Sequence, residues 1–121
     1  MKILITTQYF YPENFRINDF AFKMVRRGHE VSVITGIPNY PEGKIYNGYK
    51  QKGILCEKLN NVEIIRVPLR PRRSSNTKNL VLNYLSFVWS GLLHFPPLVR
   101  NKQFDVILVF AINNSCYIIY L

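Results

Sequence analysis

The side chains best suited to bind a ligand gather in one loop near the amino terminus. Residues 8–18 read QYFYPENFRIN and follow a strand-like opening, MKILITT. Aromatic faces in such a loop stack well against sugar rings or lipid-proximal groups. Pro12-Glu13-Asn14 also fits a plain turn that ends in a helix cap, so both interpretations stay open. The candidate side chains offer hydroxyl, carboxylate, amide and guanidinium groups, and they belong to Tyr9, Tyr11, Glu13, Asn14 and Arg16.

This first loop lacks the glycines of a dinucleotide-binding turn. Without them the backbone cannot approach a pyrophosphate closely. The helix that follows still directs free N–H groups and partial positive charge toward a ligand. The sequence therefore favours recognition through side chains and disfavours a nicotinamide-dependent enzyme, and we expect no cofactor.

Strand and helix patterns alternate around this loop. Residues 2–7 and 31–35 are short apolar runs rich in β-branched residues, which are typical of buried parallel strands. Between them, apolar residues recur at helical spacing from Ile17 to Val25. Asn14 or Asn18 is the expected cap of this helix, and Gly28 is its expected end. The opening of the chain is therefore predicted to be a β-α-β unit.

Further strand patterns follow a long loop. Residues 36–52 carry prolines, glycines and tyrosines without a regular period, and long loops of this kind are usually functional or mobile. Residues 53–58 and 62–67 predict a hairpin, and residues 104–111 predict another buried strand. Within the long loop, Asn39 and Tyr40 are further candidates to line a ligand site.

These elements predict an α/β fold, a Rossmann-like parallel sheet flanked by helices, in a single domain over residues 1–121. With strands in the order 62–67, 31–35, 2–7 and 104–111, the connection reverses between the last two. Ligands of open α/β sheets bind beside the carboxyl ends of strands at such a point. Residues 8–16 and 113–115, including Asn113, are therefore expected to face the crevice.

The apolar segment LVLNYLSFVWSGLLHF at residues 80–95 allows three interpretations. A membrane span requires about 20 mostly apolar residues, and Asn83, Ser86, Ser90 and His94 interrupt this one. A crossover helix packed on the sheet and an interfacial helix are the alternatives. In the interfacial case, cations before the segment would contact anionic lipid or phosphate, although they also fit a solvated rim. These cations are Arg70, Arg72, Arg73 and Lys78.

The overall charge limits the classes of binding partner that we expect. Sixteen Lys and Arg against seven Asp and Glu give a net charge of +9, which favours polyanions, anionic membranes or phosphorylated small molecules. The aromatic residues alternate with prolines in loops, and no nucleic-acid-binding pattern occurs, so nucleic acid is not expected as a partner. A basic module that binds a membrane surface or nucleic acid without catalysis stays open as the alternative function. Cys56 and Cys116 predict buried free thiols ahead of a disulfide or metal site, which indicates a reducing, cytoplasmic compartment.

Four motifs in order resemble one known family. They are the YPE loop, the RGHEV-x-V-x-T passage, the PNYP-x-G loop and the VEIIRVPL strand, and the likeness covers residues 1 to about 110. The chain is similar to the amino-terminal domain of family 4 glycosyltransferases, in the branch that builds bacterial O-antigen, capsule and colanic-acid repeat units. Asn14-Phe15 stands where many members carry a Gly-Gly pair.

The resemblance implies the acceptor-side half of a GT-B architecture of two Rossmann-like domains. Members transfer a sugar from a nucleotide-sugar donor, without a required metal, to an acceptor on a polyprenyl diphosphate. We therefore expect a peripheral protein on the cytoplasmic face of an anionic membrane. Because the family continues with a donor domain beyond residue 121, the chain alone is expected to be a truncated, inactive form. No catalytic residue is assigned.

Overall fold

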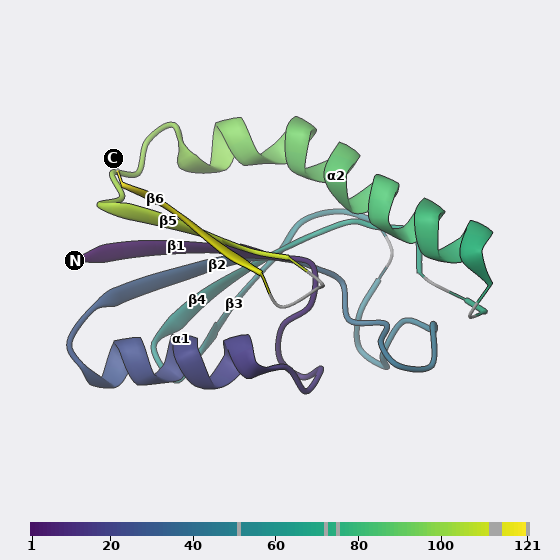
Figure 1. Cartoon of the computed structure of the whole chain (residues 1–121), viewed down its shortest axis with the longest axis horizontal. Coiled ribbons are helices and arrows are strands. Elements are labelled where there is room, and N and C mark those ends of the chain that lie inside the picture. The colour runs from purple at the N-terminus through teal and green to yellow at the C-terminus, as the bar shows by residue number, and fades with distance from the viewer. Residues whose placement is uncertain (51, 72, 75, 112–114, 121) are drawn as a thin grey trace.

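A computed structural model describes residues 1–50, 52–71, 73–74, 76–111 and 115–120. The two helices lie on opposite faces of one twisted sheet (Figure 1). This architecture is an α/β fold, as the sequence predicts. The elements in chain order are β1 (Lys2–Thr7), α1 (Arg16–Arg26), β2 (Glu30–Gly36), β3 (Leu55–Leu59), β4 (Val62–Val67), α2 (Thr77–Val99), β5 (Val106–Phe110) and β6 (Cys116–Tyr120).

The sheet has six strands in the order β3-β4-β2-β1-β5-β6. The four central strands are parallel, which confirms the predicted order and the reversal between β1 and β5. Both edge strands are antiparallel to their neighbours, so the sheet is mixed, and the predicted Rossmann-like parallel arrangement holds for the four central strands. The predicted hairpin is β3-β4, whereas β6 has no counterpart in the sequence analysis.

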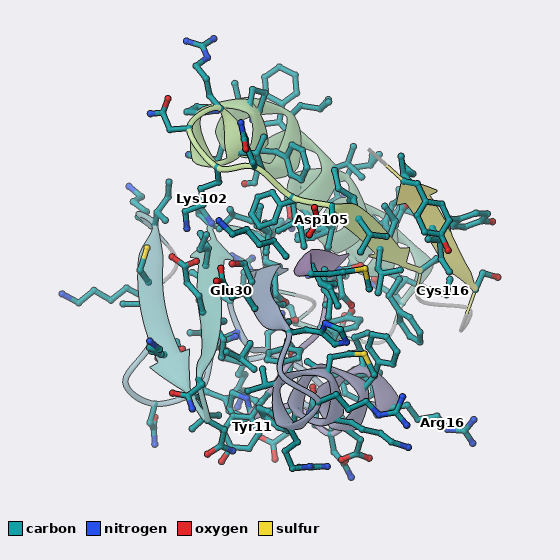
Figure 2. The ribbon with its side chains drawn as sticks, turned by 90° about the vertical axis from the view of Figure 1, so that its left-hand side faces the viewer. Tyr11, Arg16, Glu30, Lys102, Asp105 and Cys116 are labelled. Carbon is teal, nitrogen blue, oxygen red and sulfur yellow. The ribbon has the colours of Figure 1, made fainter. Side chains whose placement is uncertain are left out.

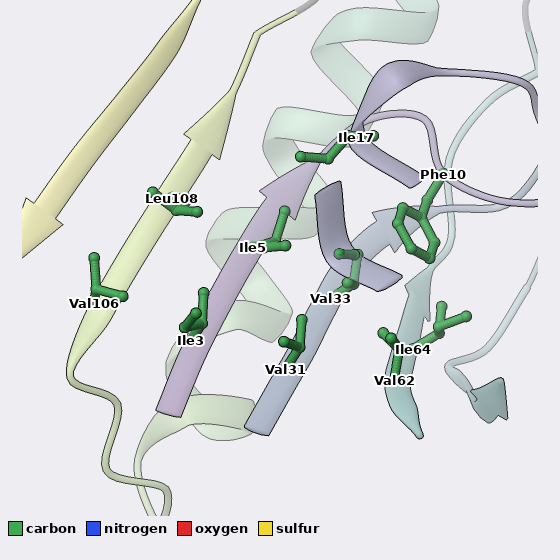
Figure 3. Close-up of a cluster of buried hydrophobic side chains, with 11 residues drawn as sticks. Ile3, Ile5, Phe10, Ile17, Val31, Val33, Val62, Ile64, Val106 and Leu108 are labelled. Atoms are coloured by element: carbon green, nitrogen blue, oxygen red, sulfur yellow. The ribbon is translucent and has the colours of Figure 1, made fainter. Parts of the chain in front are cut away.

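The core under α1 follows from the register of the parallel strands. Ile5 of β1 pairs with Val33 of β2 and with Leu108 of β5, and Val33 pairs in turn with Ile64 of β4. Because side chains alternate along strands, all four project to the same face (Figure 3). Ile17 and Ala21 of α1 cover this row and are fully or almost fully buried. The apolar period of the sequence thus produces one closed layer.

The start of helix α1 differs from the prediction, whereas its end agrees with it. The residue before its first turn is Phe15, and no side chain of the described residues caps it, so the prediction of an Asn14 or Asn18 cap is wrong. Asn18 lies inside the helix instead, where its Nδ2 donates to the Glu13 carbonyl at 2.7 Å. Gly28 ends the helix with φ of +90°, a conformation that glycine adopts without strain.

Helix α2 is longer than its apolar segment. It runs from Thr77 to Val99 and includes Pro96 and Pro97, which lie just beyond the apolar segment of residues 80–95. Proline φ is compatible with a helix, although each proline lacks the N–H donor and its ring crowds the carbonyl four residues earlier. Both prolines lie in the last turn, so only two residues of the helix follow them. Within the described residues, we find no helix with the length and apolarity needed to cross a membrane.

The two cysteines are free, as predicted, but both are exposed, so the prediction of burial is wrong. Cys56 lies on β3 and Cys116 begins β6, which are the two edges of the sheet. An edge strand has a single neighbour, and its side chains receive less cover. Cys116 stands at the outer margin of the sheet in Figure 2.

Candidate functional site

Two loops meet at the carboxyl edge of the parallel strands, and Glu13 joins them. Its Oε1 accepts hydrogen bonds from the backbone N–H of Asn39 at 2.8 Å and of Tyr40 at 2.7 Å. Its Oε2 accepts from the N–H of Phe10 at 3.3 Å. Glu13 itself is 1% exposed. The YPE loop after β1 and the PNYP loop after β2 are therefore held together by one buried carboxylate.

Burial dominates the proton affinity of this carboxylate. Desolvation raises the pKa of Glu13 from its ordinary 4.5 to about 7, against the lowering effects of the Tyr40, Asn39 and Phe10 N–H groups and of the Arg66 guanidinium. Both oxygens are occupied by these donors. The structure thus gives Glu13 a positioning role between the two loops, and its contact with a ligand stays a prediction.

The aromatic candidates pack on one another beside Glu13. The Tyr9 and Phe15 rings stack with centroids 5.1 Å apart and planes at 9°. Tyr40 lies tilted against both, at 5.1 Å from Phe15 and 5.5 Å from Tyr9. Offset or tilted ring pairs of this kind stabilise by about 0.5–1.5 kcal/mol beyond their burial. Phe15 was missed by the sequence analysis, although an aromatic residue just before a helix is a recognisable signal.

Three of the candidates remain accessible at the start of α1. Asn14 and Arg16 are exposed, and Tyr11 is 45% exposed. Figure 2 places Tyr11 and Arg16 on the side of the sheet that α1 covers. The predicted residues therefore separate into a frame, with Tyr9, Glu13 and Asn39 buried and Tyr40 half-buried, and an accessible group (Tyr11, Asn14 and Arg16). Asn113 lies outside the described residues.

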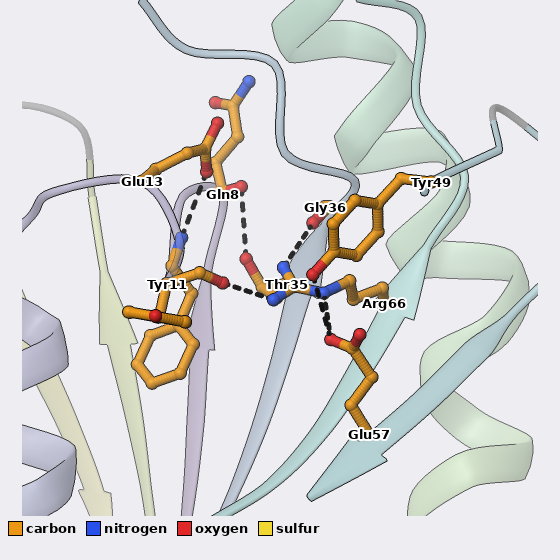
Figure 4. Close-up of polar contacts among 9 residues, drawn as sticks. Gln8, Tyr11, Glu13, Thr35, Gly36, Tyr49, Glu57 and Arg66 are labelled. Atoms are coloured by element: carbon orange, nitrogen blue, oxygen red, sulfur yellow. Dashed lines mark hydrogen bonds and ion pairs between the residues drawn. The ribbon is translucent and has the colours of Figure 1, made fainter. Parts of the chain in front are cut away.

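Arg66 binds the backbone of the first loop and of the end of β2, and the sequence analysis missed it. Its Nε donates to Glu57 at 2.7 Å, its Nη1 to the Gly36 carbonyl at 3.4 Å, and its Nη2 to the Tyr11 carbonyl (Figure 4). The Tyr49 ring lies 5.0 Å from the guanidinium carbon. The side chain is fully buried. A basic residue inside the buried strand run VEIIRV was the available signal, since a buried charge requires partners.

A second polar bridge connects the first loop to α2. Asn83 is fully buried, and its Oδ1 accepts from Gln8 Nε2 at 2.6 Å and from the Tyr9 hydroxyl at 3.1 Å. Its Nδ2 donates to the Arg70 carbonyl at 2.6 Å. In the sequence Asn83 had been only an interruption of an apolar segment. The structure shows that this amide fixes α2 to the loops of the site.

The basic candidates lie beside the amino-terminal end of α2. Arg73 and Lys78 are exposed, Arg70 is half-buried, and Arg72 lies outside the described residues. The Arg73 backbone N–H donates to the Gly43 carbonyl at 2.8 Å, which ties this segment to the loop after β2. At the far end of α2, Lys102 is already paired, because its Nζ donates to both Glu63 oxygens at 2.7 Å.

In the part of the chain that the structure describes, no three His, Cys, Asp or Glu side chains gather closely enough to hold a metal ion. Taken together, the fold and the loops define an α/β domain with a loop-built edge at the carboxyl ends of its parallel strands. Comparison with models of protein families gives no match, and a search of curated proteins finds no related sequence.

Proposed function

We propose that this chain is the acceptor-side domain of a glycosyltransferase, the Rossmann-like amino-terminal half of a GT-B fold. It would take part in transfer of a sugar from a nucleotide-sugar to a polyprenyl-diphosphate-linked acceptor in bacterial surface-polysaccharide synthesis. One observation carries the proposal. The YPE and PNYP loops, which are two of the motifs behind the resemblance, are joined by Glu13 at the carboxyl edge of the sheet.

The accessible group supplies chemistry for a phosphorylated acceptor. Arg16 is exposed in the first turn of α1, and that turn has no side-chain cap among the described residues. A helix start of this kind presents N–H groups and partial positive charge, and a guanidinium binds phosphate oxygens through two parallel hydrogen bonds. Tyr11 and Asn14 add hydrogen-bonding groups within the same loop. An acceptor diphosphate and its sugar are the ligand that this combination favours.

The apolar outer side of α2 supports an acceptor that is linked to a membrane lipid. The outer side of α2 exposes large apolar side chains, and the exposed Lys78 lies at its start. Apolar residues with cations at their margin are typical of segments that lie in the interface of an anionic bilayer. A membrane-surface module without catalysis is the second candidate function, and this face favours it. The exposed apolar residues are Val81, Tyr84, Leu85, Val88, Trp89, Leu92 and Leu93.

Acceptor binding tests the proposal. Isothermal titration calorimetry would measure binding of a farnesyl-diphosphate-linked N-acetylhexosamine to the chain. Arg16→Gln is expected to weaken binding by roughly threefold to tenfold, through loss of a charge-assisted contact. Lys23→Gln is the matched control, because Lys23 is exposed in the last turn of the same helix. Equal effects of the two variants, or no binding of the sugar-bearing compound, would contradict the proposal.

Liposome flotation distinguishes the membrane-surface module from the glycosyltransferase. Binding to anionic vesicles is expected to fall when Arg70, Arg73 and Lys78 are changed together to Glu, at about 1 kcal/mol for each cation near the surface. Retention of vesicle binding without acceptor binding in the calorimetric titration would favour the membrane-surface module over the glycosyltransferase. Tight, salt-sensitive binding of RNA in place of both would contradict the two candidates together.

A further inference from the structure

A cavity of about 350 Å³ lies between α2 and the carboxyl ends of β1 and β5. This volume falls within the range of about 300–1,000 Å³ that small-ligand sites occupy. Its walls are apolar, with Phe87, Val88, Leu92 and Phe95 from α2 and Val109 from β5. None of the described residues that line it is charged. An ionised ligand group would lose its hydration there without a counter-charge, so the cavity suits a neutral ligand.

The sheet side of this cavity has a polar end. Thr6 of β1 pairs with Ile34 of β2 and with Val109 of β5, and all three residues line the cavity. Thr6 is thus a hydroxyl in an otherwise apolar row. Its Oγ1 is buried and has no hydrogen-bond partner among the described residues. A buried oxygen in this position costs about 1–3 kcal/mol until a donor reaches it.

Gln8 places a second acceptor beside Thr6. Gln8 is 4% exposed and also lines the cavity. Its Nε2 donates to Asn83 at 2.6 Å, and this bond fixes which end of the amide faces α2. The other end, Oε1, is buried and finds no donor within the described ranges. Two buried oxygens without a hydrogen-bond partner among the described residues therefore belong to residues that line the same apolar cavity.

The opposite end of the cavity leads to the apolar surface of α2. Tyr84 and Leu92 belong to its lining and are 48% and 68% exposed. They are also part of the exposed outer side of the helix. A hydrocarbon chain that extends from the cavity would therefore leave it along an apolar surface and would not enter water directly.

We propose that this cavity binds a neutral single-chain amphiphile, with the hydroxyl or amide N–H of its head group donating to Gln8 or Thr6. The hydrocarbon chain lies along Phe87, Val88 and Leu92. A carboxylate or diphosphate head is disfavoured by the uncharged walls. The site is therefore distinct from the diphosphate contacts of the proposed acceptor, and the inference does not depend on sugar transfer.

A larger side chain at position 91, in place of Gly91, should block this site. It lines the cavity, and a Cβ added to it would meet no atom within 4 Å. A side chain at this position therefore grows into open space. The substitution also favours the helix, because glycine in a helix interior is about 1 kcal/mol less favourable than alanine. Gly91→Leu should fold and fill the cavity.

Fluorescence of N-phenyl-1-naphthylamine, a neutral probe with one N–H donor, measures occupancy. We expect the full chain to bind the probe and Gly91→Leu to bind it at least about tenfold more weakly, which corresponds to about 1.4 kcal/mol. Val88→Trp, from the rim, is a second block if Gly91→Leu fails to fold. Leu93→Phe adds volume on the same helix at an exposed position outside the lining, and it should bind as the unchanged chain does.

Competition tests the head group. Decanol should displace the probe at a roughly threefold to tenfold lower concentration than nonyl methyl ether, which has the same number of heavy atoms but no donor. Thr6→Val should reduce this preference, and decanoate should compete less well than decanol. Unchanged probe binding in both blocking variants would overturn the site. Equal competition by the alcohol and the ether would overturn the assignment of a hydrogen-bonding ligand.

Discussion

The two faces of the sheet differ in how completely they are covered. On the α1 face, eleven buried residues form one continuous cluster, and partly buried side chains such as Phe22 and Met24 close its margin. On the α2 face, the buried cluster among the described residues consists of Leu4, Ile34, Ile65 and Val67, and Phe87 and Phe95 pack against it. The cavity and the exposed apolar side chains of α2 are both on this second side.

This contrast separates stability from binding. A closed layer loses contacts whenever a side chain is shortened, because interiors are densely packed. A layer with a cavity and an exposed apolar surface has space that a ligand or a lipid surface fills. We infer that the α1 face contributes most of the folding stability, whereas the α2 face is available for binding.

The largest expected effect comes from a matched pair of aromatic truncations. Phe10→Ala removes a fully buried ring from the α1 face and should lower the free energy of unfolding by roughly 3–5 kcal/mol. Phe87→Ala removes a partly buried ring that already borders the cavity, and should cost about 1–2 kcal/mol. Urea denaturation measures both losses of unfolding free energy, and the comparison requires that the two variants have equal m-values. Equal losses would remove the proposed difference between the faces.

The next effect is a pH dependence at the junction of the loops. The folded-state pKa of Glu13, about 7, lies above its ordinary 4.5. The folded chain therefore holds this proton more tightly than the unfolded chain. The resulting stability is fully present below about pH 4.5 and is lost as the pH rises through 7, a change of roughly 3 kcal/mol.

Glu13→Gln should flatten this part of the stability profile between pH 4.5 and 7. The amide cannot ionise, although its NH₂ group no longer accepts the Phe10 N–H. Thermal unfolding across this pH range gives the measurement. Glu42→Gln is the control, because it removes an exposed carboxylate from the loop that Glu13 holds. A slope that persists in Glu13→Gln would place its origin elsewhere.

Opposite changes in the two helices sharpen the comparison. Ala21→Gly in α1 should cost about 1–2 kcal/mol, because it adds backbone entropy to the unfolded chain and deletes a buried methyl group. Gly91→Ala in α2 should increase stability by about 0.5–1 kcal/mol, since its Cβ enters open space. Both are read from the midpoint of urea unfolding. A loss of stability in Gly91→Ala would show that the α2 face is closed there.

The smallest effect on stability concerns the exposed aromatics of the two helices. Trp89→Gln on α2 and Phe20→Gln on α1 replace side chains that are 65% and 38% exposed. Each should change the free energy of unfolding by less than about 0.5 kcal/mol. In flotation with anionic vesicles, Trp89→Gln alone should reduce binding. A similar reduction in Phe20→Gln would mean that the membrane does not distinguish the faces.

Local patterns in the sequence were sufficient for the centre of the fold. The β-branched runs, the helical spacing of Ile17 to Val25, the position of Gly28 and the short turn before residues 62–67 predicted the β-α-β opening and the hairpin. These features depend on periodicity, turn conformation and the chirality of crossover connections, all of which act over short stretches of chain. The loop side chains were recognised for the same reason, since each follows a strand.

Only the tertiary structure decided what those side chains do. Glu13 is buried because its partners, Asn39 and Tyr40, are brought to it by the pairing of β1 with β2. Arg66 and Asn83 likewise take their roles from partners distant in the sequence. The exposed cysteines follow from which strands lie at the edges, and the cavity from how α2 rests on the sheet. Such relations depend on desolvation and packing between segments, which no local pattern encodes.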